Sequence, residues 1–101
     1  MFVYNITMKV DVAIAEEWLQ WQTEEHIPEV MSTGFFTHYK FFQLLEQDES
    51  EGLTYVVQYF TNTKENYDRY IKEFAPSLRK KAIEKWGDGF IAFRTLLKVM
   101  H

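Results

Sequence analysis

Apolar residues follow two rhythms that succeed one another along the chain. A period of two, typical of strands, describes residues 2–10, 35–45, 53–60 and 90–99. A period near 3.6, typical of helices, fills the segments after Asp11 and after Asn62. The predicted order is therefore strand, helix, strand, strand, helix, strand.

Local signals predict where the first helix begins and ends. Asp11 is expected to be its N-cap, and Pro28 is expected to kink or end it near Ile27. Gly34 marks the exit toward the second strand. An acidic turn at residues 46–52 then closes a hairpin with the third strand.

The second helix carries comparable signals. Asn62 with Glu65 three residues later has the spacing of a capping box. Pro76 is expected to divide the helix into two pieces, and Gly87 fits the position just beyond its end.

This order of elements predicts an α+β fold of the ferredoxin-like βαββαβ type, with a four-stranded antiparallel sheet covered by helices on one face. A length of 101 residues suits a single domain, residues 1–101. The last strand also alternates, and its more apolar set is expected to lie under the helices with the apolar sets of the first and third strands. That set is Ile91, Phe93 and Leu97.

The opposite face of the sheet is then mixed in character. It would carry Asn5, Thr7, Thr54, Val56, Gln58, Ala92 and Arg94. Such a face is too apolar to be left in water and too polar for a dry core, and aromatic residues make up 18% of the chain. We therefore expect the sheet to pack against a second copy, giving a homodimer.

Composition narrows the chemistry. The absence of cysteine excludes disulfides, thiolate zinc sites and thiol catalysis, and suits a reducing compartment such as the cytoplasm. No apolar run approaches the ~18 residues of a membrane span, and no export signal opens the chain. We expect no cofactor. The net charge is −4, with an acidic first half and a more basic second helix, so the helices carry complementary charge.

His26 is a candidate catalytic residue and ligand contact. It stands at the predicted end of the first helix, where an imidazole can act as an acid or base or hold a ligand. The alternative is a histidine that binds the carbonyls freed ahead of Pro28. Glu29 gives an H-x-x-E spacing, but no second ligand pair accompanies it, so no metal site is expected.

Arg94 is the second candidate, since a guanidinium in mid-strand requires an anion or several acceptors. A small anionic ligand is one answer, with Gln58 and Asn5 as neighbouring contacts. A structural pair across the dimer is the other. Five large aromatic residues could stack a flat ligand, although their spacing is that of a core: Tyr4, Tyr55, Tyr59, Trp18 and Trp21.

The chain also resembles, almost end to end, an uncharacterised bacterial family described as a domain of unknown function. The resemblance rests on Val3-Tyr4-Asn5, Trp18-Leu19-x-Trp21, His26-Ile27-Pro28-Glu29-Val30, Thr54-Tyr55, Val57-Gln58-Tyr59-Phe60, Phe74-Ala75-Pro76, Leu78-Arg79 and Phe93-Arg94-Thr95-Leu96-Leu97. That family looks like part of the dimeric α/β-barrel superfamily, which implies paired sheets but no particular reaction.

These observations predict a homodimeric small-molecule-binding or minor metabolic protein with a pocket under the helices or at the dimer seam. The alternatives are a cofactor-independent monooxygenase or isomerase of the related barrels, a purely structural dimer and an RNA-binding module. The RNA alternative is disfavoured because Glu51 and Leu53 stand where the RNA-recognition motif needs a base and an aromatic ring.

Overall fold

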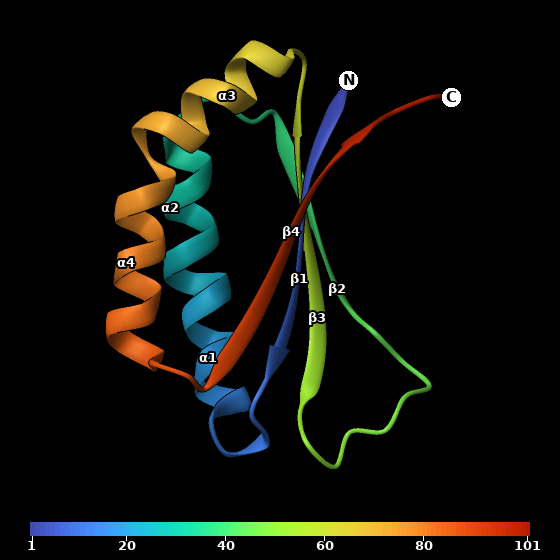
Figure 1. Ribbon diagram of the computed structural model, residues 1–101, viewed down its shortest axis with the longest axis vertical. Helices are drawn as coiled ribbons and strands as arrows, with labels where there is room; N and C mark the ends of the chain where they lie inside the picture. Colours follow the sequence, from blue (N-terminus) through green and yellow to red (C-terminus); the bar gives the residue numbers. More distant parts are fainter.

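The computed structural model describes residues 1–101 and shows an α+β fold in which all helices cover one face of a four-stranded antiparallel sheet (Figure 1). The strands lie in the order β2-β3-β1-β4. Their bounds are Phe2–Val10 for β1, His38–Gln43 for β2, Leu53–Thr61 for β3 and Phe90–Lys98 for β4. The predicted ferredoxin-like order is confirmed.

Two helical segments run side by side over the same face of the sheet (Figure 1). The first consists of a 3₁₀ turn Val12–Ile14, α1 Ala15–Trp21, a π-helical turn Gln22–His26 and α2 Ile27–Ser32. The second consists of α3 Lys64–Glu73 and α4 Ala75–Trp86. Complementary charge joins them at one point, where Lys81 Nζ lies 3.1 Å from Glu29 Oε2.

Of the two outcomes expected of Pro28, an end of the first helix near Ile27 is wrong, whereas a departure from regular α-helical geometry does occur just before Ile27. The helical path continues to Ser32. A π-helical turn precedes Ile27, whose backbone N–H donates to the carbonyl of Gln22. Pro28 then stands in the first turn of α2, where a missing backbone N–H costs little.

The second helical segment begins, breaks and ends close to the residues expected from the sequence. The N-cap of α3 is Thr63 and not Asn62, because the Thr63 hydroxyl accepts a hydrogen bond from the Asn66 backbone N–H. Pro76 lies at the start of α4, after the predicted break. Gly87 ends α4 with φ of 58°, a backbone conformation that favours glycine.

The second strand is shorter than predicted. Only His38–Gln43 forms a ladder with β3, while Phe35 and Phe36 precede the strand. Phe36 is 5% exposed and packs against Tyr59 and Tyr70. The apolar character of this segment therefore reflects burial beneath α3, and not strand pairing.

The face assigned to β4 is reversed. Arg94 pairs with Ile6 and Ala92 with Met8, so Arg94 and Ala92 share the helix-covered face with the buried side chains of β1. Ile91 and Phe93 lie on the opposite face, 58% and 65% exposed. The error arises because both faces of β4 carry apolar residues, so alternation alone cannot tell which face is covered.

The core lies between sheet and helices. Its largest fully buried side chains are Trp18 and Tyr59. Aromatic rings make many of its contacts, including Trp18 against Tyr55 at 5.2 Å and Tyr4 against Tyr67 at 5.5 Å between ring centroids. None of the helices has the length and apolar character needed to cross a membrane.

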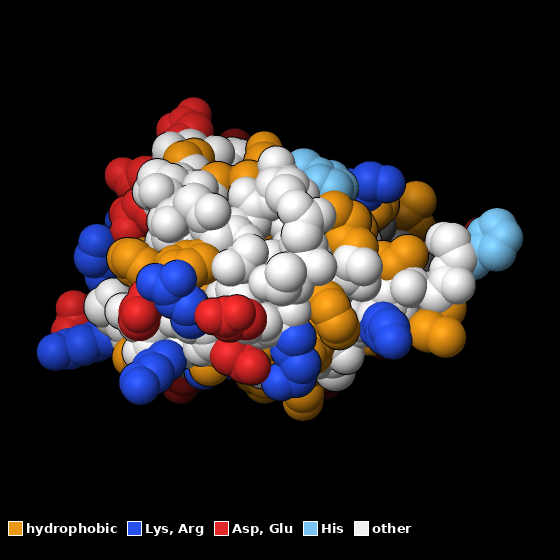
Figure 2. Space-filling view, turned by 90° about the horizontal axis from the view of Figure 1, so that it is seen from above, with side chains coloured by type: hydrophobic (Ala, Val, Ile, Leu, Met, Phe, Trp, Pro, Cys, Tyr) orange, Lys and Arg blue, Asp and Glu red, His pale blue; other side chains and the backbone are white.

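The open face of the sheet has an ordered pattern. One polar residue from each strand, Lys40, Gln58, Asn5 and Thr95, forms a straight row across the ladder. Apolar side chains flank this row, among them Phe42, Val56, Phe93, Phe60 and Leu97. From the end of the molecule, charged side chains crowd the helical side, whereas hydrophobic side chains reach the surface toward the strands (Figure 2).

Candidate functional site

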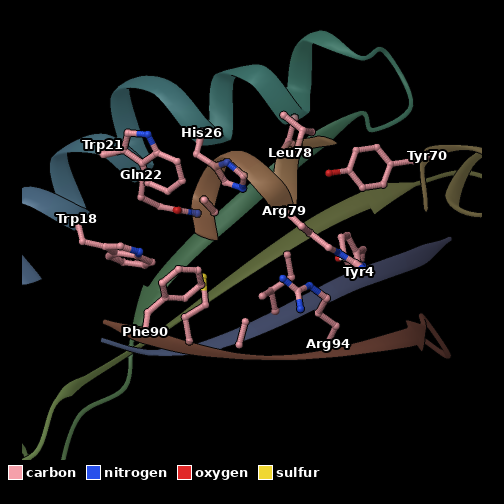
Figure 3. A pocket seen from close by; sticks show the side chains of 15 residues that line it. Tyr4, Trp18, Trp21, Gln22, His26, Tyr70, Leu78, Arg79, Phe90 and Arg94 are labelled. Atoms are coloured by element: carbon pink, nitrogen blue, oxygen red, sulfur yellow. The ribbon is translucent and has the colours of Figure 1, made fainter. Parts of the chain in front are cut away.

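A cavity lies between the helix-covered face of the sheet and the helices above it (Figure 3). Its volume is about 480 Å³ with the open mouth included. Most of its walls are hydrophobic; they include Ile6, Met8, Trp18, Trp21, Val30, Leu78, Phe90 and Ala92. The cavity therefore suits a small guest with an apolar part.

The closed end of the cavity is formed by the first helical segment. Trp18 on α1 and Gln22 on the π-helical turn are one turn apart, 0% and 1% exposed. Figure 3 shows the Gln22 amide directed into the cavity beside the indole of Trp18. A buried amide on an otherwise apolar helix stripe requires hydrogen-bond partners.

The open end is formed by two arginines from different elements. Arg79 on α4 donates from Nη2 to the Tyr4 hydroxyl at 3.0 Å, and its Nε is buried without a partner. Arg94 on β4 is exposed at the mouth. Neither guanidinium forms a salt bridge, although five other basic side chains do. Two cationic groups without carboxylate partners thus face one apolar cavity.

His26 lies between these two ends. Its ring stacks on Trp21 with 4.8 Å between centroids and an interplanar angle of 23°. Burial lowers the pKa of His26 to about 4; the positive charges of Arg94 and Lys81 act in the same direction, and Glu29 acts against them. The imidazole is therefore neutral near pH 7 and can both donate and accept a hydrogen bond.

Tyr70 on α3 completes the wall near Arg79 (Figure 3). Burial raises the pKa of Tyr70, and the neighbouring hydroxyl of Tyr4 adds to the rise. Its phenol therefore remains protonated at neutral pH. Hydroxyl, guanidinium and imidazole groups are thus available at the cavity without any carboxylate among its lining residues.

The structure brings together two of the four residues predicted as site residues. His26 and Arg94 both line the cavity. Asn5 and Gln58 lie on the open face, where Gln58 Nε2 donates to Asn5 Oδ1 at 3.2 Å and Asn5 Nδ2 donates to Thr95 Oγ1 at 3.4 Å. These four residues therefore do not form one site, because the sheet separates the two pairs.

Sequence reasoning missed Gln22 and Arg79. A signal for Gln22 is present, since it falls four residues after Trp18 on the apolar stripe of the first helix. Arg79 adjoins buried Leu78 and gives no comparable signal. No group of three or more His, Asp or Glu side chains is arranged to hold a metal ion.

Comparison with known proteins places the chain in a family. The model of the domain of unknown function DUF4286 matches residues 1–100. The chain belongs to this family. No curated protein sequence matches the chain at a significant level.

Solved structures share the fold of this DUF4286 chain at low sequence identity. A dimeric ferredoxin-like protein from an uncultured marine organism is 15% identical with a TM-score of 0.68, covering 100% of this chain and 96% of that one. SnoaB, a cofactor-independent oxygenase from Streptomyces nogalater, is 9% identical with a TM-score of 0.64, covering 99% and 94%. A putative antibiotic biosynthesis monooxygenase from Bacillus cereus is 16% identical with a TM-score of 0.63, covering 99% and 93%.

Proposed function

We propose that this protein is a homodimer that binds a small organic anion in the cavity between its sheet and helices. The observation that carries the proposal is the pair of guanidinium groups, Arg79 and Arg94, which line an otherwise largely apolar cavity without a salt-bridge partner. A carboxylate suits such a pair, because each guanidinium can donate two parallel hydrogen bonds to its two oxygens.

The surroundings of the two arginines favour a bound anionic ligand over a carboxylate of the protein itself as their partner. The acidic group that acts on His26 is Glu29, and its carboxylate already binds Lys81 at 3.1 Å. Arg79 is half-buried, so its charge is only partly solvated. A bound carboxylate would neutralise this charge and accept from the unpartnered Nε.

The walls of the cavity limit the size and polarity of the ligand beyond its carboxylate. Aromatic and aliphatic side chains surround the space between Arg94 and the closed end, and the whole cavity with its open mouth measures about 480 Å³. Only a short apolar body fits without movement of the walls. The ligand is therefore a small carboxylate with a short aliphatic or compact aromatic part.

Dimerisation is supported by the open face of the sheet. Phe93, Ile91 and Phe42 are 65%, 58% and 46% exposed, and with the other apolar side chains of this face they form a mixed patch around the polar row. An exposed patch of this kind in a small protein is typical of a contact surface. A structural neighbour is described as a dimeric ferredoxin-like protein. In the proposed dimer, Val56 and Gln58 lie at the contact.

A thermal-shift panel of C4 to C7 alkanoates tests the proposal. Saturating carboxylate should raise the melting temperature of the wild type by mass action. Arg94→Met should abolish that response while the protein remains folded, since Met fills much of the same space. Arg69→Met is the matched control, because Arg69 lies on α3 in a salt bridge with Glu73 and outside the cavity. The absence of any response in the wild type would refute the proposal.

A cofactor-independent oxygenase is the second candidate. Two structural neighbours are described as an oxygenase and as a putative monooxygenase, and both share the fold. The low pKa of His26 makes it a weak base near neutral pH, which favours binding over proton abstraction. An oxygen electrode separates the two: oxygen consumption with a bound carboxylate supports the enzyme, and unchanged ligand with no oxygen uptake supports the binder.

The remaining alternatives make different predictions. A purely structural dimer would show no carboxylate response. An RNA-binding module would bind labelled single strands at low salt with steep salt dependence, which the net charge of −4 disfavours. We propose that no nucleic acid binds specifically, and fluorescence anisotropy tests this. A cytoplasmic location accords with the lack of cysteine and can be tested by fractionation.

A further inference from the structure

The closed end of the cavity contains a hydrogen-bond donor without an acceptor. The indole Nε1 of Trp18 is fully buried and has no hydrogen-bond partner. Trp18 lines the cavity, and Figure 3 shows its nitrogen turned to the interior on the side of Gln22. A buried N–H without an acceptor is unfavourable, because the group loses its hydrogen bond to water on folding.

Gln22 lines the same cavity one helical turn after this unpaired donor. The two residues are four positions apart on the same helical path, and the amide of Gln22 also points into the cavity (Figure 3). The side chain is 1% exposed, so solvent does not satisfy it freely. The indole can only donate, whereas the amide offers two N–H donors and one acceptor.

Both ends of the cavity therefore present hydrogen-bond donors that need an acceptor atom. At the mouth, Arg79 and Arg94 present cationic donors. At the closed end, Trp18 and Gln22 present neutral donors, and apart from His26 the residues between the two ends are hydrophobic. A ligand with one carboxylate can satisfy only one of these ends.

We propose, building on the function proposed above, that the ligand is an oxo-carboxylate whose carboxylate binds Arg79 and Arg94 and whose distant carbonyl oxygen accepts hydrogen bonds from Trp18 and Gln22. A carbonyl is the chemistry that fits the closed end because it accepts two hydrogen bonds and carries no net charge. A second carboxylate at that end would be buried without a cation. Trp18 and Gln22 are thus specificity-determining residues.

Matched ligand pairs provide the test. The probes are 4-oxopentanoate, 5-oxohexanoate and 6-oxoheptanoate, each compared by calorimetric titration with the alkanoate of the same chain length. We expect one member of the oxo series to bind wild type about tenfold more tightly than its alkanoate, the effect of pairing otherwise unsatisfied donors. The chain length that shows the largest ratio measures the spacing between the two ends.

Two variants locate the effect. Trp18→Phe removes the donor and keeps a ring, and Gln22→Leu removes the amide at similar volume. Each should reduce the oxo preference to less than about threefold while binding of the alkanoate persists. Trp86→Phe is the matched control, because the Trp86 indole N–H is also buried without a partner but does not line this cavity. It should keep the full preference.

The outcomes separate this inference from the proposed function. Equal binding of oxo acids and alkanoates would overturn the inference and leave the binding of small anions intact. No binding of either series would overturn both. If Trp18→Phe does not fold, Gln22→Leu decides alone, and an undiminished oxo preference in that variant overturns the inference.

Discussion

Arg94 lies directly opposite Ile6 in the ladder between β1 and β4, and Ile6 is 8% exposed beneath the helices. Side chains opposite one another in a sheet share a face. The guanidinium of Arg94 is therefore held on the covered face, at the mouth of the cavity that also contains His26. This pairing places the sole basic residue in the middle of β4 where an anion can reach it.

The partly buried imidazole of His26 makes stability depend on pH. Its pKa is about 4 in the folded protein against an ordinary value of 6.5, so between these values the unfolded chain takes up a proton that the folded protein does not. Stability should therefore fall as the pH drops from about 6.5 to about 4, by roughly 2–3 kcal/mol in total.

Urea unfolding of wild type and His26→Gln at pH 7, 5 and 4 measures this contribution. Because carboxylates elsewhere also titrate in acid, the relevant quantity is the difference between the two proteins. The wild type should lose roughly 2–3 kcal/mol more than the variant between pH 7 and pH 4. Parallel curves for the two proteins would show that His26 is protonated equally in both states.

The buried hydroxyl of Tyr59 predicts a stabilising substitution. Tyr59 is 0% exposed, its hydroxyl has no hydrogen-bond partner, and burial raises its pKa. Tyr59→Phe removes an unsatisfied polar group and keeps the ring contacts with Phe36 and Tyr4. We expect the free energy of unfolding to rise by about 1 kcal/mol or to stay unchanged. A loss greater than about 1 kcal/mol in urea unfolding would reveal a partner for the hydroxyl.

The open face predicts a change of oligomeric state. Phe93→Lys puts a charge at the most exposed aromatic position of the open face and should convert the proposed dimer to a folded monomer in light scattering at micromolar concentration. Ile83→Lys is the control, because Ile83 is 61% exposed on α4, away from the sheet. The dimer proposal fails if wild type and Phe93→Lys have the same single-chain mass.

The order of elements could be predicted from the sequence because each element has a clear period. The strand pattern of residues 2–10 and the break at Pro76 appear where they were expected. Buried and exposed apolar residues look alike in a sequence, however. Phe93 and Leu97 are as apolar as the core, yet they lie on the open face. The face of β4 could therefore be decided only from its register with β1.

The site was partly predictable for the same reason. His26 stands out by its place just before Ile27-Pro28, and Arg94 stands out as a charged residue in the middle of a strand; both line the cavity. Their convergence depends on the π-helical turn Gln22–His26, which arises where Pro28 cannot donate a backbone hydrogen bond. A sequence pattern with a fixed helical period does not anticipate that turn. Arg79 joins the site through the packing of α4 on the sheet, which is a tertiary relationship.

Binding of a carboxylate and of its uncharged amide to the wild-type protein tests the central claim most directly. Calorimetric titration with 4-methylpentanoate and with 4-methylpentanamide compares ligands of nearly identical shape. Because Arg79 and Arg94 recognise charge, the carboxylate should bind at least about tenfold more tightly than the amide. Equal affinity for the two ligands, or no measurable heat with either, would contradict the assignment of an anion site to this cavity.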